Sequence, residues 1–216
     1  MDDIVRPDAG GLIIRQYSKG TPDGLMRLAV EIAGLAGEIW REHYTPIIGA
    51  AQVEYMLEKF QSADRIYSDI INDGYVYFTA EPCAGGGDGP TGPGAGTAAG
   101  PGAKAIAGPG AVGTAESARA PAGYCAVVPQ EDRLLLSKLY VRRERRGTGV
   151  GRRFIEEAAA PCAKSYGLGK IRLTVNKYNE GSILAYKKLG FSVTDSVKTD
   201  IGGGYYMDDY IMDLTV

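Results

Sequence analysis

The sequence has few of the residues from which metal sites and disulfide frameworks are built. It contains one histidine, His43, and three cysteines among 216 residues. An odd number of cysteines without metal-type spacing predicts free thiols, and a single histidine leaves almost no donor set for zinc or a di-iron centre. We therefore expect no metal in the chemistry, and a chain that works in the reducing cytoplasm.

Long apolar runs and a strong net charge are missing as well. No stretch approaches the ~18 consecutive apolar residues of a membrane span. The start, Met1-Asp2-Asp3, lacks the basic and apolar regions of a secretory signal. The net charge is −2, so a general attraction to nucleic acid or to an anionic membrane is not expected. Neither is predicted as a partner.

Glycine and proline are in excess, and much of the excess lies in one segment. Residues 81–121 hold 12 Gly, 11 Ala and 6 Pro and no aromatic residue. Such a composition cannot bury enough apolar surface to offset the entropy lost on ordering. We predict that 81–121 is a flexible loop inserted between two strands of a single domain, 1–216, whose length allows a sizeable core.

Outside that segment the pattern changes between strand-like and helix-like stretches. Pro46 is expected to end the first helix, and Pro161, inside a later helix, is expected to kink or shorten that helix. The residues 202–204, all glycine, read as a hairpin connection. The order of elements predicts a mixed α/β (α+β) domain. Strands are expected at 12–16, 75–79, 124–128, 134–141, 171–175, from 191, and at 205–214, and helices at 21–44, 53–60, 66–70, from 150, and at 182–189.

A strongly basic segment follows the predicted strand 134–141. Residues 138–153 contain seven cations and one anion, Glu144, which gives a local charge of +6. Three glycines allow a tight turn with its N–H groups inward, and a helix follows at once, an arrangement typical of phosphate binding. A Walker loop and a dinucleotide-binding loop both need other spacings. The alternative is an exposed basic face with a glycine turn.

Two motifs in this region resemble those of one enzyme family. Arg146-x-x-Gly149-x-Gly151 is similar to the acetyl-CoA signature Arg/Gln-x-x-Gly-x-Gly/Ala of the GCN5-related N-acetyltransferase (GNAT) superfamily. Further on, Asn179 and the segment 186–191 (Tyr-Lys-Lys-Leu-Gly-Phe) resemble the family's Asn…Tyr-x-Lys-x-Gly-Phe element. The resemblance implies a GNAT-like domain with a twisted, mostly antiparallel sheet of about six or seven strands. It also implies a few flanking helices, about four.

The resemblance further implies acetyl-CoA as co-substrate and direct transfer of its acetyl group to a primary amine. Tyr186 would lie near the thioester sulfur, bind the cofactor and protonate the leaving thiolate. Asn179 would contact the pantetheine arm. Arg142, Arg143 or Lys188 would meet the outer phosphate. The remaining implied cofactor-binding residues are Leu139, Tyr140 and Val141 for the arm, held like an added strand, and Arg146, Gly147, Thr148, Gly149, Val150, Gly151 and Arg152 for the pyrophosphate.

The general base is left open by the sequence. Several family members carry a carboxylate on the strand that enters the phosphate loop, whereas residues 134–139 contain no acid. The candidates are Glu38, Glu42, His43 and a chain of water molecules. Glu38 and Glu42 share a helix face, and His43 titrates in a suitable range. Glu42 and His43 are the predicted catalytic residues beside Tyr186.

Charge asymmetry bears on the acceptor. Residues 21–80 carry nine acids and four bases, and the tail from 195 carries five acids and one base. An acidic acceptor side favours a cationic small-molecule amine such as a polyamine, and residues 39–44 and 206–210 look closest to the small-amine and polyamine branch. The alternatives are a protein N-terminal or lysine acetyltransferase and a non-catalytic CoA-binding regulatory module. A homodimer is left open.

Overall fold

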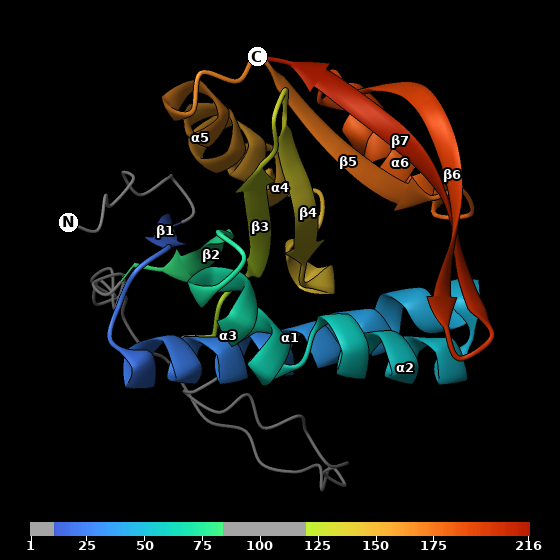
Figure 1. Ribbon diagram of the computed structural model, residues 1–216, viewed down its shortest axis with the longest axis horizontal. Coiled ribbons are helices and arrows are strands. Elements are labelled where there is room, and N and C mark those ends of the chain that lie inside the picture. Colours follow the sequence, from blue (N-terminus) through green and yellow to red (C-terminus); the bar gives the residue numbers. More distant parts are fainter. Residues whose placement is uncertain (1–10, 84–119) are drawn as a thin grey trace, which may run out of the picture.

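The computed structural model describes residues 11–83 and 120–216. Within them, seven strands form one open sheet in the order β1-β2-β3-β4-β5-β7-β6 (Figure 1). Neighbouring strands are antiparallel, except that β4 and β5 are parallel. The strands are β1 (Leu12–Tyr17), β2 (Val76–Pro82), β3 (Gly123–Pro129), β4 (Leu134–Val141), β5 (Lys170–Asn176), β6 (Ser192–Gly202) and β7 (Tyr205–Thr215).

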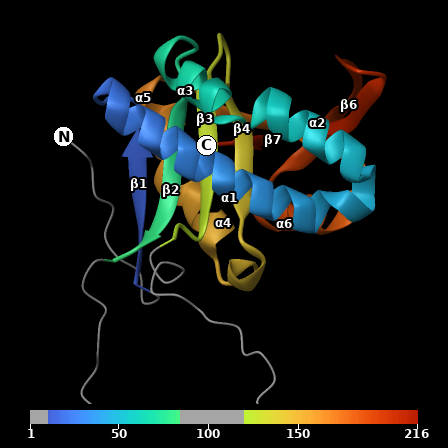
Figure 2. The same cartoon turned by 90° about the horizontal axis from the view of Figure 1, so that it is seen from below.

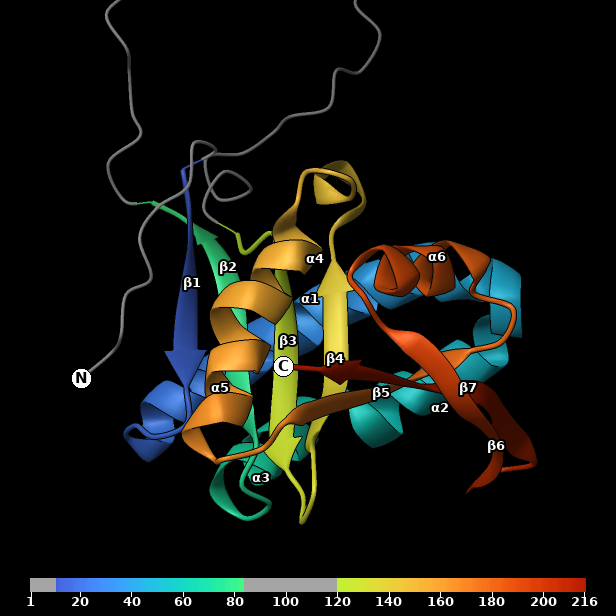
Figure 3. The same ribbon diagram turned by 90° about the horizontal axis from the view of Figure 1, so that it is seen from above.

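Helices cover both faces of the sheet. One face carries α1 (Pro22–Ile48), α2 (Ala50–Phe60) and α3 (Ala63–Ile71), which lie in front of the strands in Figure 2. The other carries a continuous helical run, made of α4 (Val150–Arg153), a π-helical segment (Phe154–Ala159) and α5 (Ala160–Ser165), together with α6 (Glu180–Lys188) (Figure 3). The predicted mixed α/β domain with a mostly antiparallel sheet is confirmed.

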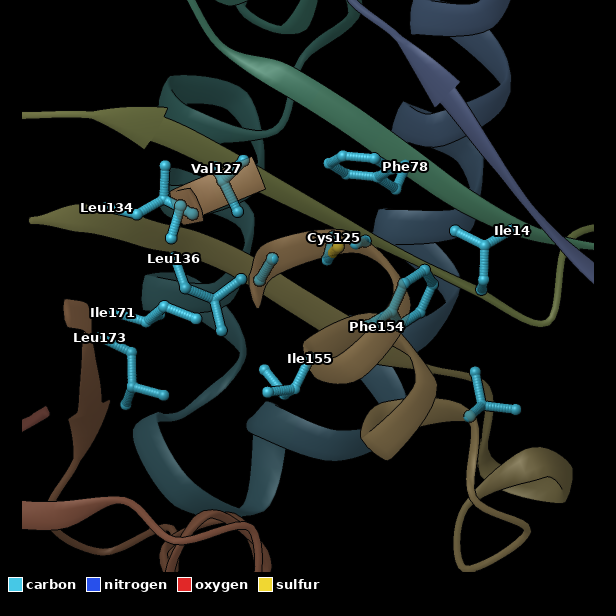
Figure 4. Packing of buried hydrophobic residues seen from close by; sticks show 14 of the residues in the cluster. Ile14, Phe78, Cys125, Val127, Leu134, Leu136, Phe154, Ile155, Ile171 and Leu173 are labelled. Atoms are coloured by element: carbon cyan, nitrogen blue, oxygen red, sulfur yellow. The ribbon is translucent and has the colours of Figure 1, made fainter. Parts of the chain in front are cut away.

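Apolar side chains alternate between the two faces of the sheet along its strands, and they form one hydrophobic core on each face. On β3, Cys125 and Val127 face the helical run, where Phe154 and Ile155 pack against them (Figure 4). Tyr124, from the same strand, belongs to the core beneath α1, α2 and α3. Because successive side chains of a strand point to opposite faces, a single strand contributes to both cores.

The predicted end of the first helix at Pro46 is wrong. Helix α1 continues to Ile48 and ends at Gly49, whose φ is 82°. Pro46 lies in the last turn, where its ring fits helical φ and only one hydrogen bond is lost. The helix continues because Ile48 packs against the core beneath α1.

The expected disturbance around Pro161 takes the form of a wider turn. The N–H of Ala160 bonds to the carbonyl of Ile155, five residues earlier, which is the π-helical pattern. Pro161 follows at the start of α5. A proline ring clashes with the carbonyl four residues before it, and a π turn is a known way for a helix to accommodate such a residue.

Most of the predicted inserted loop, 81–121, lies outside the described residues. At its near end the prediction needs correction, because Glu81 and Pro82 belong to β2 and pair with Ile13 and Leu12 of β1. Composition gave no sign of this pairing, since proline at the end of an inner strand is uncommon. The inserted loop itself stays a prediction.

The feature that opens the sheet is the divergence of β4 and β5. These strands pair at two positions only, Leu134 with Ile171 and Leu135 with Arg172, and then separate (Figures 1 and 3). A β-bulge lies at the point of separation, because Val127 opposes Leu136 and Ala126 opposes Lys138, which leaves Ser137 unpaired. Bulges bend a strand and increase its twist. Beyond residue 135, therefore, the edge of β4 is not covered by β5.

The bulge also directs Lys138 into the interior. Its Nζ lies 2.5 Å from Asp69 Oδ2 and 2.7 Å from the hydroxyl of Tyr77. Asp69 forms a second ion pair with Arg65, at 2.5 Å. Burial lowers the pKa of Lys138, and the Asp69 carboxylate opposes this shift. The strand that enters the basic loop thus carries a buried cation that is neutralised by α3.

Asp69→Ala is expected to destabilise the protein by about 3 kcal/mol or more, because it leaves the Lys138 ammonium buried without a counter-ion. Urea unfolding measures the effect. Asp73→Ala is the matched control, since it removes only the partly exposed pair with Arg65, worth up to about 1 kcal/mol. Equal losses in the two variants would contradict the account, and the double change Asp69→Ala with Lys138→Met should recover most of the lost stability.

Candidate active site

A cavity of about 570 Å³ lies where β4 and β5 separate. Both helical layers contribute to its wall: Tyr44 comes from α1, Tyr140 from β4, Tyr186 from α6 and Asp209 from β7. Its volume lies in the ordinary range of small-molecule sites. Two of the cofactor-binding residues predicted on β4, Leu139 and Tyr140, line it together with Tyr186.

The glycine loop follows directly at the end of β4. Gly147 and Gly149 have φ of 78° and 95°, a region that other residues rarely adopt. Among the described residues, no hydrogen-bond partner is found for the main-chain N–H groups from Gly147 to Arg152. A Cβ placed on Gly147 or Gly149 would meet nothing within 4 Å. The loop therefore offers unused donors to open space at the start of a helical run, which suits an anion.

Two arginines fasten this loop to α1. The Nε of Arg146 donates to the carbonyl of Val141 at 3.0 Å, and its Nη2 lies 2.6 Å from Glu42 Oε2. Arg142 donates to the carbonyl of Pro121 at 2.9 Å and forms an ion pair with Glu38. These contacts hold the loop in one position relative to the cavity.

Most of the positive charge in segment 138–153 is neutralised by neighbouring acids, so less of it is available to bind an anion than the sequence indicates. Within the described part of the chain, six of the seven cations of the segment form ion pairs, although the pair of Arg143 with Glu42 is long, at 4.0 Å. Arg143 and Arg145 lie on the exposed 3₁₀ turn (Arg143–Arg145), and the side chain of Arg143 is 79% exposed. Arg152 and Glu156 are both more than half exposed, so that pair is weak and can yield to a ligand. The six paired cations are Lys138, Arg142, Arg143, Arg146, Arg152 and Arg153.

Glu42 and His43 lie at the end of α1, beside the loop and outside the residues that line the cavity. The ion pair with Arg146 lowers the pKa of Glu42. His43 Nε2 lies 3.2 Å from Asn179 Oδ1, and its Nδ1 lies 3.5 Å from Arg146 Nη1. Burial, and then Arg146, lower the pKa of His43, so a neutral ring that donates from Nε2 to Asn179 fits these contacts.

Asn179 is buried and connects three elements. Its Oδ1 accepts from the N–H of Ser182 at 3.3 Å and so caps α6, while its Nδ2 donates to the hydroxyl of Tyr44 at 3.4 Å. Together with the contact to His43, these bonds fix the start of α6 against the end of α1. Asn179 does not line the cavity, although Ser182 does.

Tyr186 combines a packed ring with a free hydroxyl. The ring meets Phe191 edge to face at 5.7 Å between centroids. No hydrogen bond to its hydroxyl is found among the residues that the structure describes. Burial raises the pKa of Tyr186. A phenol of raised pKa in a cavity wall keeps its proton at neutral pH and can donate it.

Asp209 is a cavity residue that the sequence analysis counted only within the acidic tail. It is 6% exposed and pairs in register with Asn176 of β5. Burial, and then Asp208, raise the pKa of Asp209 to about 6, and Lys177 opposes them. A signal was present, because Asp209 follows Tyr205 and Met207 at intervals of two along the strand. It thus shares their face, which packs toward the core beneath α1.

The β6–β7 hairpin closes the cavity on the side of α2. The predicted hairpin connection is present, but its turn consists of Gly203 and Gly204, because Gly202 is the last residue of β6 and pairs with Tyr205. The hydroxyl of Tyr55 and the Nζ of Lys59, both on α2, donate to the carbonyl of Ile201 at 2.6 and 2.5 Å. The hairpin and α2 are therefore held together over the end of the cavity.

Neither a metal-binding group nor a membrane-spanning helix is found within the described residues. No group of three or more His, Cys, Asp or Glu side chains that could hold a metal ion is found in 11–83 and 120–216. Over the same residues, no helix has the length and apolarity to cross a membrane.

Residues 103–191 match the model of the Acetyltransferase (GNAT) family. This span contains β3, β4, the glycine loop and α6. Comparison with curated proteins finds no match.

Solved structures share the fold. The PaiA N-acetyltransferase of Thermoplasma acidophilum, in complex with coenzyme A, is similar with a TM-score of 0.63 at 17% identity, over 94% of this chain and 99% of that one. A GCN5-related N-acetyltransferase from Rhodopseudomonas palustris has a TM-score of 0.61 at 14% identity, over 99% and 98%. A spermidine N-acetyltransferase from Vibrio cholerae has 0.52 at 13%, over 95% and 94%.

These structural likenesses, at such low identity, concern the fold. The family match covers both motifs, Arg146-x-x-Gly149-x-Gly151 and the segment from Asn179 to Phe191. The strand, the glycine loop with its unused N–H groups, and the cavity beside Tyr186 follow one another in space. Residues 103–191 are thus similar to the Acetyltransferase (GNAT) family, and the chain shares the fold of solved N-acetyltransferases.

Proposed function

We propose that the protein transfers the acetyl group of acetyl-CoA directly to the primary amine of a small cationic molecule, with polyamines as the favoured class. The observation that carries this proposal is the continuity of the site. The unused N–H groups from Gly147 to Arg152 lie at the end of β4, and the cavity with Tyr186 and Asp209 opens along the same strand. One end of the site suits a diphosphate and the other an ammonium group.

The cofactor would lie along β4. Its pyrophosphate would accept from the loop N–H groups between Gly147 and Arg152. Its pantetheine arm would pair with Leu139, Tyr140 and Val141 as an added strand in the gap left by β5. Arg143, exposed beside the loop, suits the outer phosphate better than Arg142, whose guanidinium is held by Glu38 and Pro121.

Tyr186 would act as the general acid. A raised pKa keeps its hydroxyl protonated, and that hydroxyl faces the cavity without a protein partner. It can therefore donate to the thiolate as the C–S bond breaks. The N–H of Val141 would stabilise the oxyanion. For Glu42 and His43 the contacts support positioning, because they hold Arg146 and Asn179.

The acceptor end supports a cation. Trp40, Tyr44 and Tyr140 form an aromatic wall, with ring centroids 4.6 Å apart for Trp40 and Tyr44 and 5.4 Å apart for Trp40 and Tyr140. Aromatic faces attract ammonium groups, and Asp209 adds a carboxylate to the same cavity. A volume of about 570 Å³ suits a small molecule.

Thiol release from acetyl-CoA, measured across a panel of acceptors, tests the function. Polyamines and diamines are expected to be acetylated with the highest kcat/KM, and neutral amines poorly. Peptides with a free N-terminus or a lysine are included in the panel. Better turnover of peptides would assign a protein acceptor instead. Binding of acetyl-CoA without thiol release on any acceptor would overturn the proposal in favour of a regulatory module.

Compartment and assembly are part of the same proposal. Cys83, Cys125 and Cys162 are free thiols, which supports a reducing cytoplasm. Light scattering on the purified protein tests the homodimer, whose mass would be twice the 22.9 kDa of the chain.

A further inference from the structure

A buried carboxylate without a partner is uncommon in a folded protein. Asp209 is 6% exposed, and among the described residues its side chain has no hydrogen bond and no ion pair. Its carboxylate oxygens are not among the fully enclosed atoms that lack a partner, so they reach the open space of the cavity, and a partner for them is expected there. The carboxylate of Asp209 belongs to the wall of the cavity, where a ligand can supply the missing partner.

We propose that Asp209 is the general base that takes a proton from the acceptor's ammonium group. This inference rests on the proposed acetyl transfer to a cationic amine. Asp209 lies on β7 opposite Asn176, on the stretch of β5 that has left β4. The carboxylate of Asp209 lies close enough to Tyr44 and Tyr140 to contribute to their raised pKa values. An ammonium group held against the aromatic wall would therefore be within reach of Asp209.

The other acids near the site are already engaged. Glu38 and Glu42 form ion pairs with Arg142 and Arg146 and lie outside the cavity wall. Asp69 does line the cavity, but it is held by Lys138 and Arg65 and accepts from the hydroxyl of Tyr77. Among the described residues, Asp209 is thus the acid of the cavity wall that is free to take a proton.

His43 is a weaker alternative. Both of its ring nitrogens contact protein groups, Asn179 and Arg146, and His43 is not part of the cavity wall. A proton on its second nitrogen would place a charged ring beside the Arg146 guanidinium, which is unfavourable.

The proton balance is straightforward. The carboxylate of Asp209 accepts one proton from R–NH₃⁺ and passes it to solvent. The neutral amine attacks the thioester carbonyl and forms the C–N bond. As the C–S bond breaks, Tyr186 protonates the CoA sulfur and recovers the second amine proton from the nitrogen. The products are R–NH–CO–CH₃, CoA–SH and one released proton.

The charges around Asp209 affect its pKa and therefore the pH range in which it can act as a base. On its own strand, Asp208 raises its pKa, while Lys177, which follows β5 and pairs with Asp208 at 2.5 Å, lowers it. Tyr44 of α1 and Tyr140 of β4 are neutral at physiological pH, because burial raises both pKa values. On β6, the register partner is Val197, which is uncharged. With a pKa of about 6, Asp209 is ionised at pH 7 and is a stronger base than an exposed carboxylate.

The test compares Asp209→Asn with Asp208→Asn. The acceptor is whichever amine the wild-type protein acetylates best. Asp209→Asn is expected to lower kcat/KM about 100-fold at pH 7.5, the lower end for loss of a general base. It should also remove the acidic limb of the pH–rate profile, which is the fall in kcat/KM as the pH decreases through about 6. Asp208→Asn should keep most of the activity and move that limb to lower pH. Binding of acetyl-CoA, measured separately, should be unchanged in both.

The outcomes separate this inference from the function on which it rests. If the wild-type protein acetylates an amine and Asp209→Asn retains the rate and the acidic limb, Asp209 is not the base while the acetyltransferase function stands. If the wild-type protein binds acetyl-CoA and acetylates nothing, the proposed function fails and the base role fails with it. Recovery of the acidic limb in Asp209→Glu would support the assignment.

A stability measurement distinguishes a base from a structural residue. The pKa of Asp209 is raised from 3.8 to about 6 in the folded state, so its burial costs stability that grows as the pH rises through that range. Asp209→Asn should therefore raise Tm by about 5 °C at pH 8, and the difference should vanish toward pH 4. A lower Tm for Asp209→Asn at pH 8 would indicate a structural carboxylate and overturn the inference.

Discussion

Gly149→Glu is expected to weaken acetyl-CoA binding by about 1,000-fold, the equivalent of several kcal/mol. The space around Gly149 is open, and the neighbouring N–H groups have no protein partner among the described residues. A glutamate there would place a carboxylate where we propose that the pyrophosphate binds. Isothermal titration with CoA measures the loss.

Backbone strain must be separated from charge in this experiment. Gly149 has φ of 95°, so any side chain at this position is strained. Gly149→Ala carries the strain without bulk or charge, and Gly149→Gln adds the bulk of glutamate without its charge. We expect a modest loss for alanine, a larger one for glutamine and by far the largest for glutamate. Equal CoA affinity in the glutamate and alanine variants would contradict the placement of the pyrophosphate.

Tyr186→Phe is expected to lower kcat by about 100-fold to 1,000-fold, a typical contribution of a general acid. The ring would keep its contact with Phe191, at 5.7 Å between centroids. The hydroxyl has no hydrogen bond to the described residues, so its removal leaves no protein donor or acceptor unpaired. Stopped-flow detection of thiol release measures kcat, and the affinity for acetyl-CoA should change little.

Tyr178→Phe is the matched control for that variant, because Tyr178 lies close in sequence and is 72% exposed. It should have the activity and stability of the wild-type protein. A Tyr186→Phe variant with unchanged kcat would show that another group, or water, protonates the thiolate. A variant that instead loses acetyl-CoA affinity would indicate a binding role for the hydroxyl.

The proposed position of the base, Asp209 on β7, differs from the pattern of the GNAT family that residues 103–191 match, and there is a structural reason for it. Several family members carry an acid on the strand that enters the phosphate loop. In this protein, Lys138 is buried on that strand and bound by Asp69. A second carboxylate beside it would compete with Asp69 for the same ammonium. Placing the base on β7, at Asp209, avoids this conflict, since β7 approaches the cavity from the other side of the gap.

The elements that the sequence predicted well are those with strong local patterns. Strand β4 runs from Leu134 to Val141, as expected from its apolar alternation. The hairpin at Gly202 was readable because three consecutive glycines interrupt an alternating run. Helix α1 was predicted too short, because the sequence shows Pro46 but not the packing of Ile48 that lets the helix continue.

Only part of the candidate site could be predicted from the sequence. The motifs around Gly149 and Tyr186 are local. The structure places the glycine loop after β4 and Tyr186 in the cavity wall, and the roles of these residues stay predictions. The charge count near Arg146 overestimated the positive charge that is free to bind an anion, because a count of residues does not reveal which cations are paired. Asp209 was passed over, because its burial depends on strands and helices far away in the sequence.

By itself, the sequence predicted the resemblance to the GNAT family, the glycine loop and the residues that alternate to form two cores. These features depend on neighbours within a few residues, which a sequence displays directly. Only the tertiary structure decided where β4 and β5 separate, which arginines are neutralised and which carboxylate is left unpaired in the cavity. Those properties arise when segments as distant as α1, α6 and β7 meet, since burial and electrostatic partnership are set by contacts between such segments.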